Sequence, residues 1–110
     1  MMDVSEFRKM AMNFPEAEEK PHFEKTSFRI KGKIFATFNI STEIATLKFS
    51  MVDQSVFCDM GKLQIYPVPN KWGKQGWTHL EVNKLDNMII QDALTASFKL
   101  VAPKKISDKL

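Results

Sequence analysis

The sequence predicts one α+β domain whose elements follow in the order helix, three strands, helix, two strands, helix. Helix-capping residues and apolar residues at helical spacing mark the three helices. Runs of β-branched and aromatic residues between turn residues mark the five strands. The length of 110 residues suits a single domain, spanning 1–110, with a single hydrophobic core.

The first helix is expected to begin at Asp3, because Asp3 and Glu6 have the N-cap and N3 spacing of a capping box. It is expected to end before Pro15, since the residue before a proline avoids helical angles. Residues 16–23 are interpreted as a charged connection.

The strands are expected at Thr26–Ile30, Lys33–Ile40, Glu43–Phe49, Leu63–Val68 and Trp77–Val82. Lys31 and Gly32 predict a tight hairpin between the first two, because glycine readily takes a positive φ. Pro67 and Pro69 place the fourth strand at an edge or a bulge, since proline cannot donate to a strand ladder. Residues 70–76 are expected to form a loop.

The second helix is expected between Ser50, which has capping-box spacing with Asp53, and Gly61, a typical residue just past a helix end. Its apolar residues share one side of the helix and predict that this side is buried. They are Val52, Val56, Phe57 and Met60.

The third helix is expected from about Leu85 to Ala102, where Pro103 stops it. Its broad apolar face predicts that it packs on the core. Residues 104–110 are expected to form a mobile tail.

Charge and cysteine content limit the functional classes. A net charge of +3 is mildly basic and is compatible with one basic surface on an otherwise balanced domain. Cys58 is the one cysteine, so an internal disulfide is impossible, which agrees with a reducing compartment. No apolar run approaches the roughly 20 residues that cross a bilayer, and the first residues lack a secretion signal, so a cytoplasmic location is expected.

Four stretches of the chain form a recognisable combination: Glu18–Phe23, Ser27–Thr37, Gly76–Trp77 and Leu100–Lys105. This combination resembles the MmcQ/YjbR-like family, and the match covers nearly the whole chain. The resemblance implies a two-layer fold, an antiparallel five-stranded sheet with the helices on one face, a general layout shared with secretion chaperones. It also implies DNA binding, the activity by which the family is commonly labelled, and it brings no catalytic residues with it.

Helices on one face leave the other face of the sheet open, so alternate strand residues should face the core and the solvent. In the second strand, Ile34 is expected to face the core and Phe35 the open face. The open face and the loop after the fourth strand then collect aromatic and basic side chains. The candidate nucleic-acid-binding residues are Arg29, Phe35, Lys48, Tyr66, Lys71, Trp72, Lys74, Trp77 and His79.

Three interpretations of this surface stay open at the level of sequence. Cations neutralise phosphates and aromatic rings stack on bases, which favours DNA or RNA as the partner. An exposed aromatic patch is also typical of a homodimer interface or of a chaperone-like surface for a client protein. A small-ligand site, or plain packing of Trp77 and Tyr66 beneath the loop, is the third interpretation.

No catalytic, metal or cofactor site is predicted, so the protein is expected to be a non-enzymatic binding module. His79 and Glu81 would supply two metal ligands, whereas zinc sites use three or four. Cys58 is expected to be a poor nucleophile, because Asp59 and the carboxyl end of its helix disfavour the thiolate. His22 is interpreted as a hydrogen-bonded anchor at the entry to the first strand.

Overall fold

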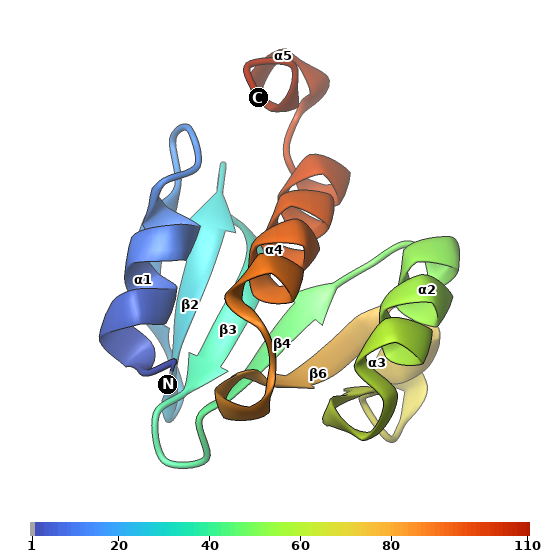
Figure 1. The fold of residues 1–110 in the computed structure, drawn as a ribbon. Helices are drawn as coiled ribbons and strands as arrows, with labels where there is room; N and C mark the ends of the chain where they lie inside the picture. The colour runs from blue at the N-terminus through green and yellow to red at the C-terminus, as the bar shows by residue number, and fades with distance from the viewer. Residues whose placement is uncertain (1) are drawn as a thin grey trace.

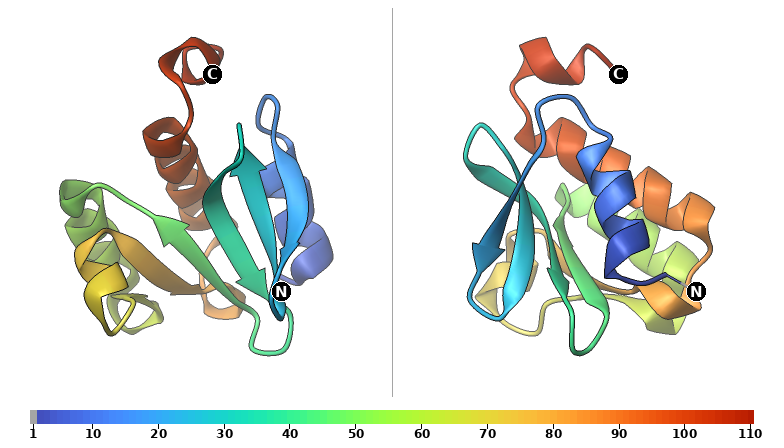
Figure 2. Two further views of the ribbon diagram at one scale, coloured as in Figure 1. Left: turned by 180° about the vertical axis from the view of Figure 1, so that it is seen from behind. Right: turned by 90° about the vertical axis from the view of Figure 1, so that its left-hand side faces the viewer.

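A computed structural model describes residues 2–110 of the chain. Antiparallel strands form one six-stranded sheet in the order β1-β2-β3-β4-β6-β5. The strands are β1 (Glu18–His22), β2 (Lys25–Ile30), β3 (Lys33–Asn39), β4 (Ile44–Lys48), β5 (Ile65–Pro67) and β6 (Trp77–Glu81). Helices α1 (Val4–Met12), α2 (Met51–Gly61) and α4 (Asn87–Val101) cover one face of the sheet (Figures 1 and 2), and we call the other face the open face. The predicted α+β fold is confirmed.

The sheet has six strands and not the predicted five, because residues 18–22 form β1 rather than a connection. β1 lies at the edge of the sheet and pairs along its whole length with β2. On the helix side, Arg8 of α1 donates two hydrogen bonds to the Glu19 carboxylate, Nε to Oε1 at 2.7 Å and Nη2 to Oε2 at 3.0 Å. A tertiary ion pair therefore supports a charged strand that shows no apolar alternation in the sequence.

Replacing Glu19 by Gln is expected to lower the free energy of unfolding at neutral pH by about 1 kcal/mol, the scale of charge-assisted hydrogen bonds at a partly exposed site. The hydrogen bonds from Arg8 lower the pKa of Glu19 below its ordinary value of 4.5. A carboxylate whose pKa is lower in the folded than in the unfolded chain stabilises the fold at pH values above its ordinary pKa. This contribution is lost as the pH falls through the lowered pKa. Urea titrations of the two proteins should therefore converge in acid, whereas the exposed neighbour Glu18→Gln should change stability little at any pH.

A bulge in β3 exchanges the faces of two residues relative to the prediction. Phe28 of β2 pairs with Ala36, and Arg29 pairs with Ile34, so Phe35 is the extra residue. Phe35 is fully buried, and its ring packs nearly at a right angle to Phe98 with centroids 5.3 Å apart. The prediction of Phe35 on the open face is therefore wrong, and Ile34 takes that position instead.

Ser97 of α4 satisfies the backbone groups that this bulge separates. Its Oγ donates to the Phe35 carbonyl oxygen at 2.6 Å and accepts from the Lys48 amide of β4 at 3.2 Å. The pairing of β3 with β4 stops at Ala36 and Leu47, just before these groups would meet. A buried hydroxyl from the helix layer thus fixes the backbone of Lys48, a residue that faces the open side.

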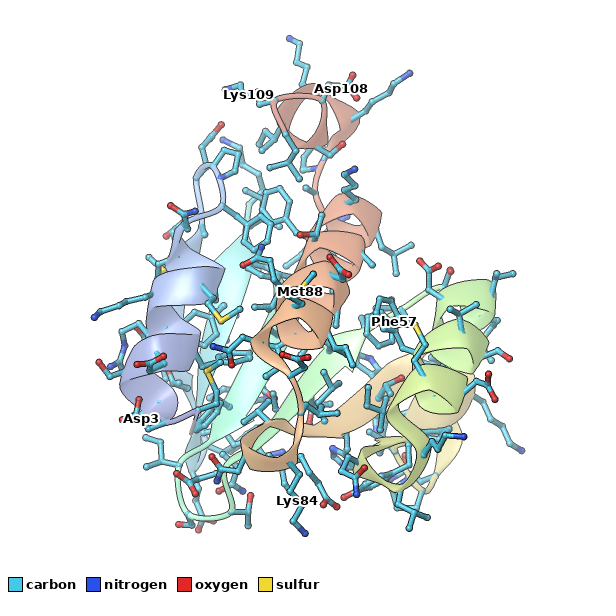
Figure 3. The ribbon with its side chains drawn as sticks, in the orientation of Figure 1. Asp3, Phe57, Lys84, Met88, Asp108 and Lys109 are labelled. Atoms are coloured by element: carbon cyan, nitrogen blue, oxygen red, sulfur yellow. The ribbon has the colours of Figure 1, made fainter. Side chains whose placement is uncertain are left out.

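Helix α2 turns a different side to the core than its apolar residues predict. Its buried residues are Gln54, Phe57 and Gly61. Phe57, whose ring lies on the inner side of the helix in Figure 3, stacks on Phe49 with centroids 4.9 Å apart. The predicted stripe is wrong for the remaining three members, with exposed fractions of 74% for Val52, 48% for Val56 and 48% for Met60. α2 packs so closely at Gly61 that any Cβ there would lie 2.2 Å from Ile65 Cγ1, so this inner position requires glycine.

The predicted helix caps are confirmed at two sites. Asp3 Oδ1, at the start of α1 in Figure 3, accepts from the Glu6 amide at 2.9 Å. Ser50 Oγ accepts from the Asp53 amide at 3.1 Å. At the other end of the chain, the segment expected to be a mobile tail contains a short helix, α5 (Lys104–Ser107), whose Ile106 is buried in the core cluster.

The segment between α2 and β6 also departs from the prediction. β5 is the second edge of the sheet, as its prolines predict, but it is shorter than expected. Residues 62–64 form a 3-10 turn that leaves Leu63 exposed. The segment expected to be a loop contains the short helix α3 (Lys71–Lys74).

The Lys31–Gly32 hairpin turn is confirmed by φ values of 52° and 79°.

Candidate functional site

A row of polar and aromatic side chains crosses four strands of the open face. Thr37, Thr46, His79 and Tyr66 lie opposite one another on β3, β4, β6 and β5. Two residues from this row along each strand, Lys48 of β4 lies opposite Trp77 of β6. Regular pairing therefore brings together side chains that are far apart in the sequence.

His79 lies half-buried in the middle of this row. Its Nδ1 is 2.8 Å from Thr46 Oγ1, a hydrogen-bond distance, and the Tyr66 ring packs edge-on with centroids 5.7 Å apart. Burial lowers the pKa of His79, and the positive charge of Lys25 lowers it further. Both effects favour the uncharged imidazole, and Nε2 is the ring nitrogen that Thr46 does not engage.

The His79 ring is expected to titrate below its ordinary pKa of 6.5 in the folded protein. Between the two values the unfolded chain binds the proton more readily, so the free energy of unfolding should fall as the pH drops below that ordinary value. Lys25→Ala should raise the pKa of His79 part of the way back, because burial remains. Imidazole NMR chemical shifts followed against pH in both proteins measure this, and an unchanged titration would show that Lys25 does not act on the ring.

Tyr66 is occupied by partners of its own. Its hydroxyl donates to Glu81 Oε2 at 2.9 Å, and Lys84 Nζ lies 3.4 Å from Glu81 Oε1. Burial first, and then the hydrogen bond to Glu81, raises the pKa of Tyr66. Tyr66 therefore supports His79 from the β5 edge.

The two tryptophans of the chain flank a concavity on the open face, which we call the aromatic slot. Its lining residues are His22, Lys25, Ile34, Thr37, Thr46, Val68, Trp72, Trp77 and His79. The slot has a volume of about 390 Å³. Trp77 belongs to β6, whereas Trp72 belongs to α3, which lies on the open side of the sheet in the left view of Figure 2. The slot thus has strands on one side and a short helix on the other.

Gln54 of α2 anchors the segment that carries Trp72. Its Nε2 donates to the Gly73 carbonyl oxygen at 2.9 Å and to Thr78 Oγ1 at 3.0 Å. Asn70 caps α3 from the other end, with Oδ1 accepting from the Trp72 amide at 2.8 Å. This role explains why the inner side of α2 includes a polar residue, and it makes α3 a fixed wall rather than a free loop.

A second concavity, which we call the basic cleft, adjoins the aromatic slot. Its four cations are Arg29, Lys33, Lys48 and Lys74. The cleft has a volume of about 720 Å³ and shares Ile34 and Trp77 with the slot. Within residues 2–110, no Asp or Glu lines the cleft or the slot. These residues make a positively charged surface beside an aromatic one.

Local contacts orient two of the four cations of the basic cleft, Arg29 and Lys48. Arg29 Nε donates to Ser27 Oγ at 3.0 Å, and the hydroxyl of Ser27 in turn donates to the Lys20 carbonyl at 2.7 Å. Lys48 Nζ lies 5.9 Å from the centroid of the Trp77 ring, within range of a cation–π contact. Among the described residues, none of the four cations forms an ion pair. Their charges therefore stay available for an anion.

The structure divides the predicted binding residues into groups. Arg29, Lys48 and Lys74 line the basic cleft, Trp72 and His79 line the aromatic slot, and Trp77 lines both. Lys71 lines neither concavity, and its Nζ lies 5.6 Å from the Trp72 ring centroid. Tyr66 lies beside the slot without lining it, and Phe35 is buried in the core.

A model of the family described as YjbR matches residues 12–100, most of the chain. The chain belongs to the YjbR family. The resemblance read from the sequence is thereby confirmed.

Solved structures share this YjbR fold. The Deinococcus radiodurans protein DR2400, with a DUF419 domain, has a TM-score of 0.82 at 18% identity, over 99% of this chain and 88% of the other. A Pseudomonas syringae protein has a TM-score of 0.67 at 18% identity, over 91% of this chain and 99% of the other. At this identity the likeness concerns the fold. Comparison with proteins of curated function found no match.

Three basic side chains of the site in this YjbR domain were not among the predicted binding residues. Lys33 joins the basic cleft, and His22 and Lys25 line the aromatic slot. Lys33 directly follows a predicted hairpin turn next to Arg29's strand, which is a signal that was present in the sequence. His22 was expected to be a hydrogen-bonded anchor, but its ring instead packs edge-on against Phe23 with centroids 4.9 Å apart.

Within residues 2–110, no three His, Cys, Asp or Glu side chains come close enough to hold a metal ion. Burial raises the pKa of the Cys58 thiol, which disfavours the thiolate. Among the described helices, none is long and apolar enough to cross a membrane.

Proposed function

We propose that this protein is a non-enzymatic module that binds nucleic acid through the open face of its sheet. One observation carries the proposal: the four unpaired cations of the basic cleft adjoin a slot between Trp72 and Trp77, with no carboxylate in the described lining of either.

The two concavities match the two chemical parts of a nucleotide. Lys and Arg neutralise phosphates, and this electrostatic attraction gives most of the sequence-independent affinity for nucleic acid. Tryptophan rings stack on bases of any identity. A site for phosphate alone would need no aromatic wall, and an aromatic patch for a protein partner would need no cluster of unpaired cations.

The test is a salt series with a fluorescently labelled oligonucleotide, read by anisotropy. Affinity should fall steeply as salt rises, because bound cations release counterions from the phosphates. Removing two cleft charges in Lys33→Ala/Lys74→Ala should weaken binding at least about fivefold and should reduce the slope of log K against log salt by roughly 1.4 to 1.8, which is about 0.7 to 0.9 for each cation. Both lysines are exposed, so the fold should survive.

The matched control removes two charges elsewhere. Lys9→Ala/Lys62→Ala changes the net charge equally, and neither of these exposed lysines lines the cleft or the slot. This control should change affinity less than about twofold, since long-range steering alone is weak at physiological salt. Equal losses in both double variants, or no binding at low salt, would overturn the proposal. A molecular mass that rises with concentration and is reset by Trp77→Asp would instead favour self-association.

A further inference from the structure

We infer, resting on the proposed function, that the ligand is a single strand: the aromatic slot takes one unstacked base, while the basic cleft holds the phosphates beside it. The two concavities share Trp77 and Ile34, so they lie next to each other on one surface. That adjacency matches the short separation of base and phosphate, which one sugar joins within each nucleotide.

The slot has the size and lining of a site for one flat ring. Its volume of about 390 Å³ is near the lower end of the roughly 300–1,000 Å³ range of ligand pockets. Trp72 and Trp77 offer aromatic surface from two different elements, α3 and β6. Bases in a duplex are stacked and paired inside the helix, so they cannot enter such a slot without leaving the stack.

Polar groups at the slot are placed to meet the edge of a base. His79 lines the slot and is bound through Nδ1 to Thr46, so Nε2 is the atom left to hydrogen-bond with a ligand. Thr37, opposite Thr46 on β3, adds a hydroxyl to the same lining. Hydroxyls and a neutral imidazole both donate and accept, which suits several bases rather than one.

The aromatic wall is held in place before any ligand binds. Gln54 fixes Gly73 from inside the fold, and Asn70 caps α3 at the Trp72 amide, as described above. Trp72 is nonetheless 49% exposed, so its ring is open to a ligand. Because the backbone that carries the ring is already fixed, this segment loses little conformational entropy on binding, which favours affinity.

The experiment compares three oligonucleotides of equal length at low salt. They are a single strand of mixed sequence, its duplex, and a strand of the same phosphates whose units are all abasic. Full removal of the bases is needed, because a strand with one abasic unit can slide another base into the slot. We expect the single strand to bind roughly tenfold more tightly than either of the others. Deoxyribose and ribose versions of the single strand then show which sugar the face prefers.

A comparison that combines one change in the protein with one change in the ligand makes the test specific to the slot. Trp72→Ala should weaken binding of the single strand roughly tenfold but should leave binding of the abasic strand unchanged, because the lost contact is with a base. Trp72→Phe should restore most of the affinity. Met88→Ala, a change at an exposed apolar residue of α4 on the covered side, is the control and should have no effect.

The outcomes separate this inference from the proposed function. Equal affinity for single strand, duplex and abasic strand, with the cleft variants still weak, would overturn the base slot while leaving nucleic-acid binding in place. No binding of any oligonucleotide would overturn both. Quenching of tryptophan fluorescence by the single strand but not by the abasic strand would support the slot directly, since the chain has only two tryptophans.

Discussion

Trp77→Ala is expected to weaken binding of a single-stranded oligonucleotide by roughly 10- to 100-fold, the larger part of the range for loss of one stacked base. The effect should exceed that of Trp72→Ala, because Trp77 lines both the aromatic slot and the basic cleft. Its ring also lies within 5.9 Å of Lys48 Nζ, so its removal frees that cation from its present position. Anisotropy titrations at one fixed salt concentration measure the change.

The fold should survive this substitution. The hydrogen bonds that fix Trp77 are made by its backbone, with the Val68 amide donating to the Trp77 carbonyl at 3.0 Å. Thermal unfolding of the variant serves as the check, and Trp77→Phe, which keeps a ring, should recover much of the affinity. A variant that stays folded and binds like the unsubstituted protein would show that Trp77 does not meet the ligand.

Gly76→Ala is expected to lower the free energy of unfolding by about 3 kcal/mol, the scale of a strained backbone position combined with a steric clash. Gly76 has φ of +104°, and a Cβ at this position would lie 1.9 Å from the Phe49 carbonyl oxygen. The Phe49 amide also donates to the Gly76 carbonyl at 2.9 Å, so the two backbones cannot separate without losing this bond. Urea unfolding followed by circular dichroism measures the loss.

Gly32→Ala is the matched control for this second prediction. Gly32 also has a positive φ, +79°, but nothing lies within 4 Å of the place where a Cβ would be. It should cost about 1 kcal/mol, the intrinsic cost of a left-handed backbone for an alanine. The difference between the two variants reports the close approach at Gly76 alone. Similar losses at both positions would mean that the loop before β6 can move aside.

Local sequence patterns predicted three of the helices and five of the six strands in their correct order, whereas β1, α3 and α5 were not predicted. Capping residues such as Asp3 and Ser50 act on amides three residues away, and the Lys31–Gly32 turn acts on its own backbone. Such short-range preferences can be recognised without knowing the rest of the fold. The family was recognised in the same way, from runs of residues rather than from contacts. Aromatic and basic residues in the strands also predicted a binding face on the open side.

Tertiary contacts decided what local patterns left undetermined. The strand β1 depends on the ion pair between Glu19 and Arg8, which come from separate elements. Phe35 lies in the core, and not on the open face as predicted, because β3 bulges there. Ser97, 62 residues away in the chain, donates a hydrogen bond to the Phe35 carbonyl oxygen. Neither contact leaves a periodic trace in the sequence, since the partner residues lie outside the segment that changes.

The separation of the aromatic slot on the open face from the basic cleft, which residues of α2 and α4 also line, likewise required the tertiary structure. Alternation along a strand predicts which side a residue faces, but it does not predict which strands become neighbours. Lys48 and Trp77 lie opposite each other because β4 pairs with β6. Trp72 lines the same slot as Trp77, and the hydrogen bond from Gln54 of α2 to the Gly73 carbonyl fixes the helix α3 that carries it. The amino-acid sequence therefore predicted most of the aromatic and basic side chains of this surface. The strand order and the buried Gln54 side-chain amide determined which of these side chains lie next to one another.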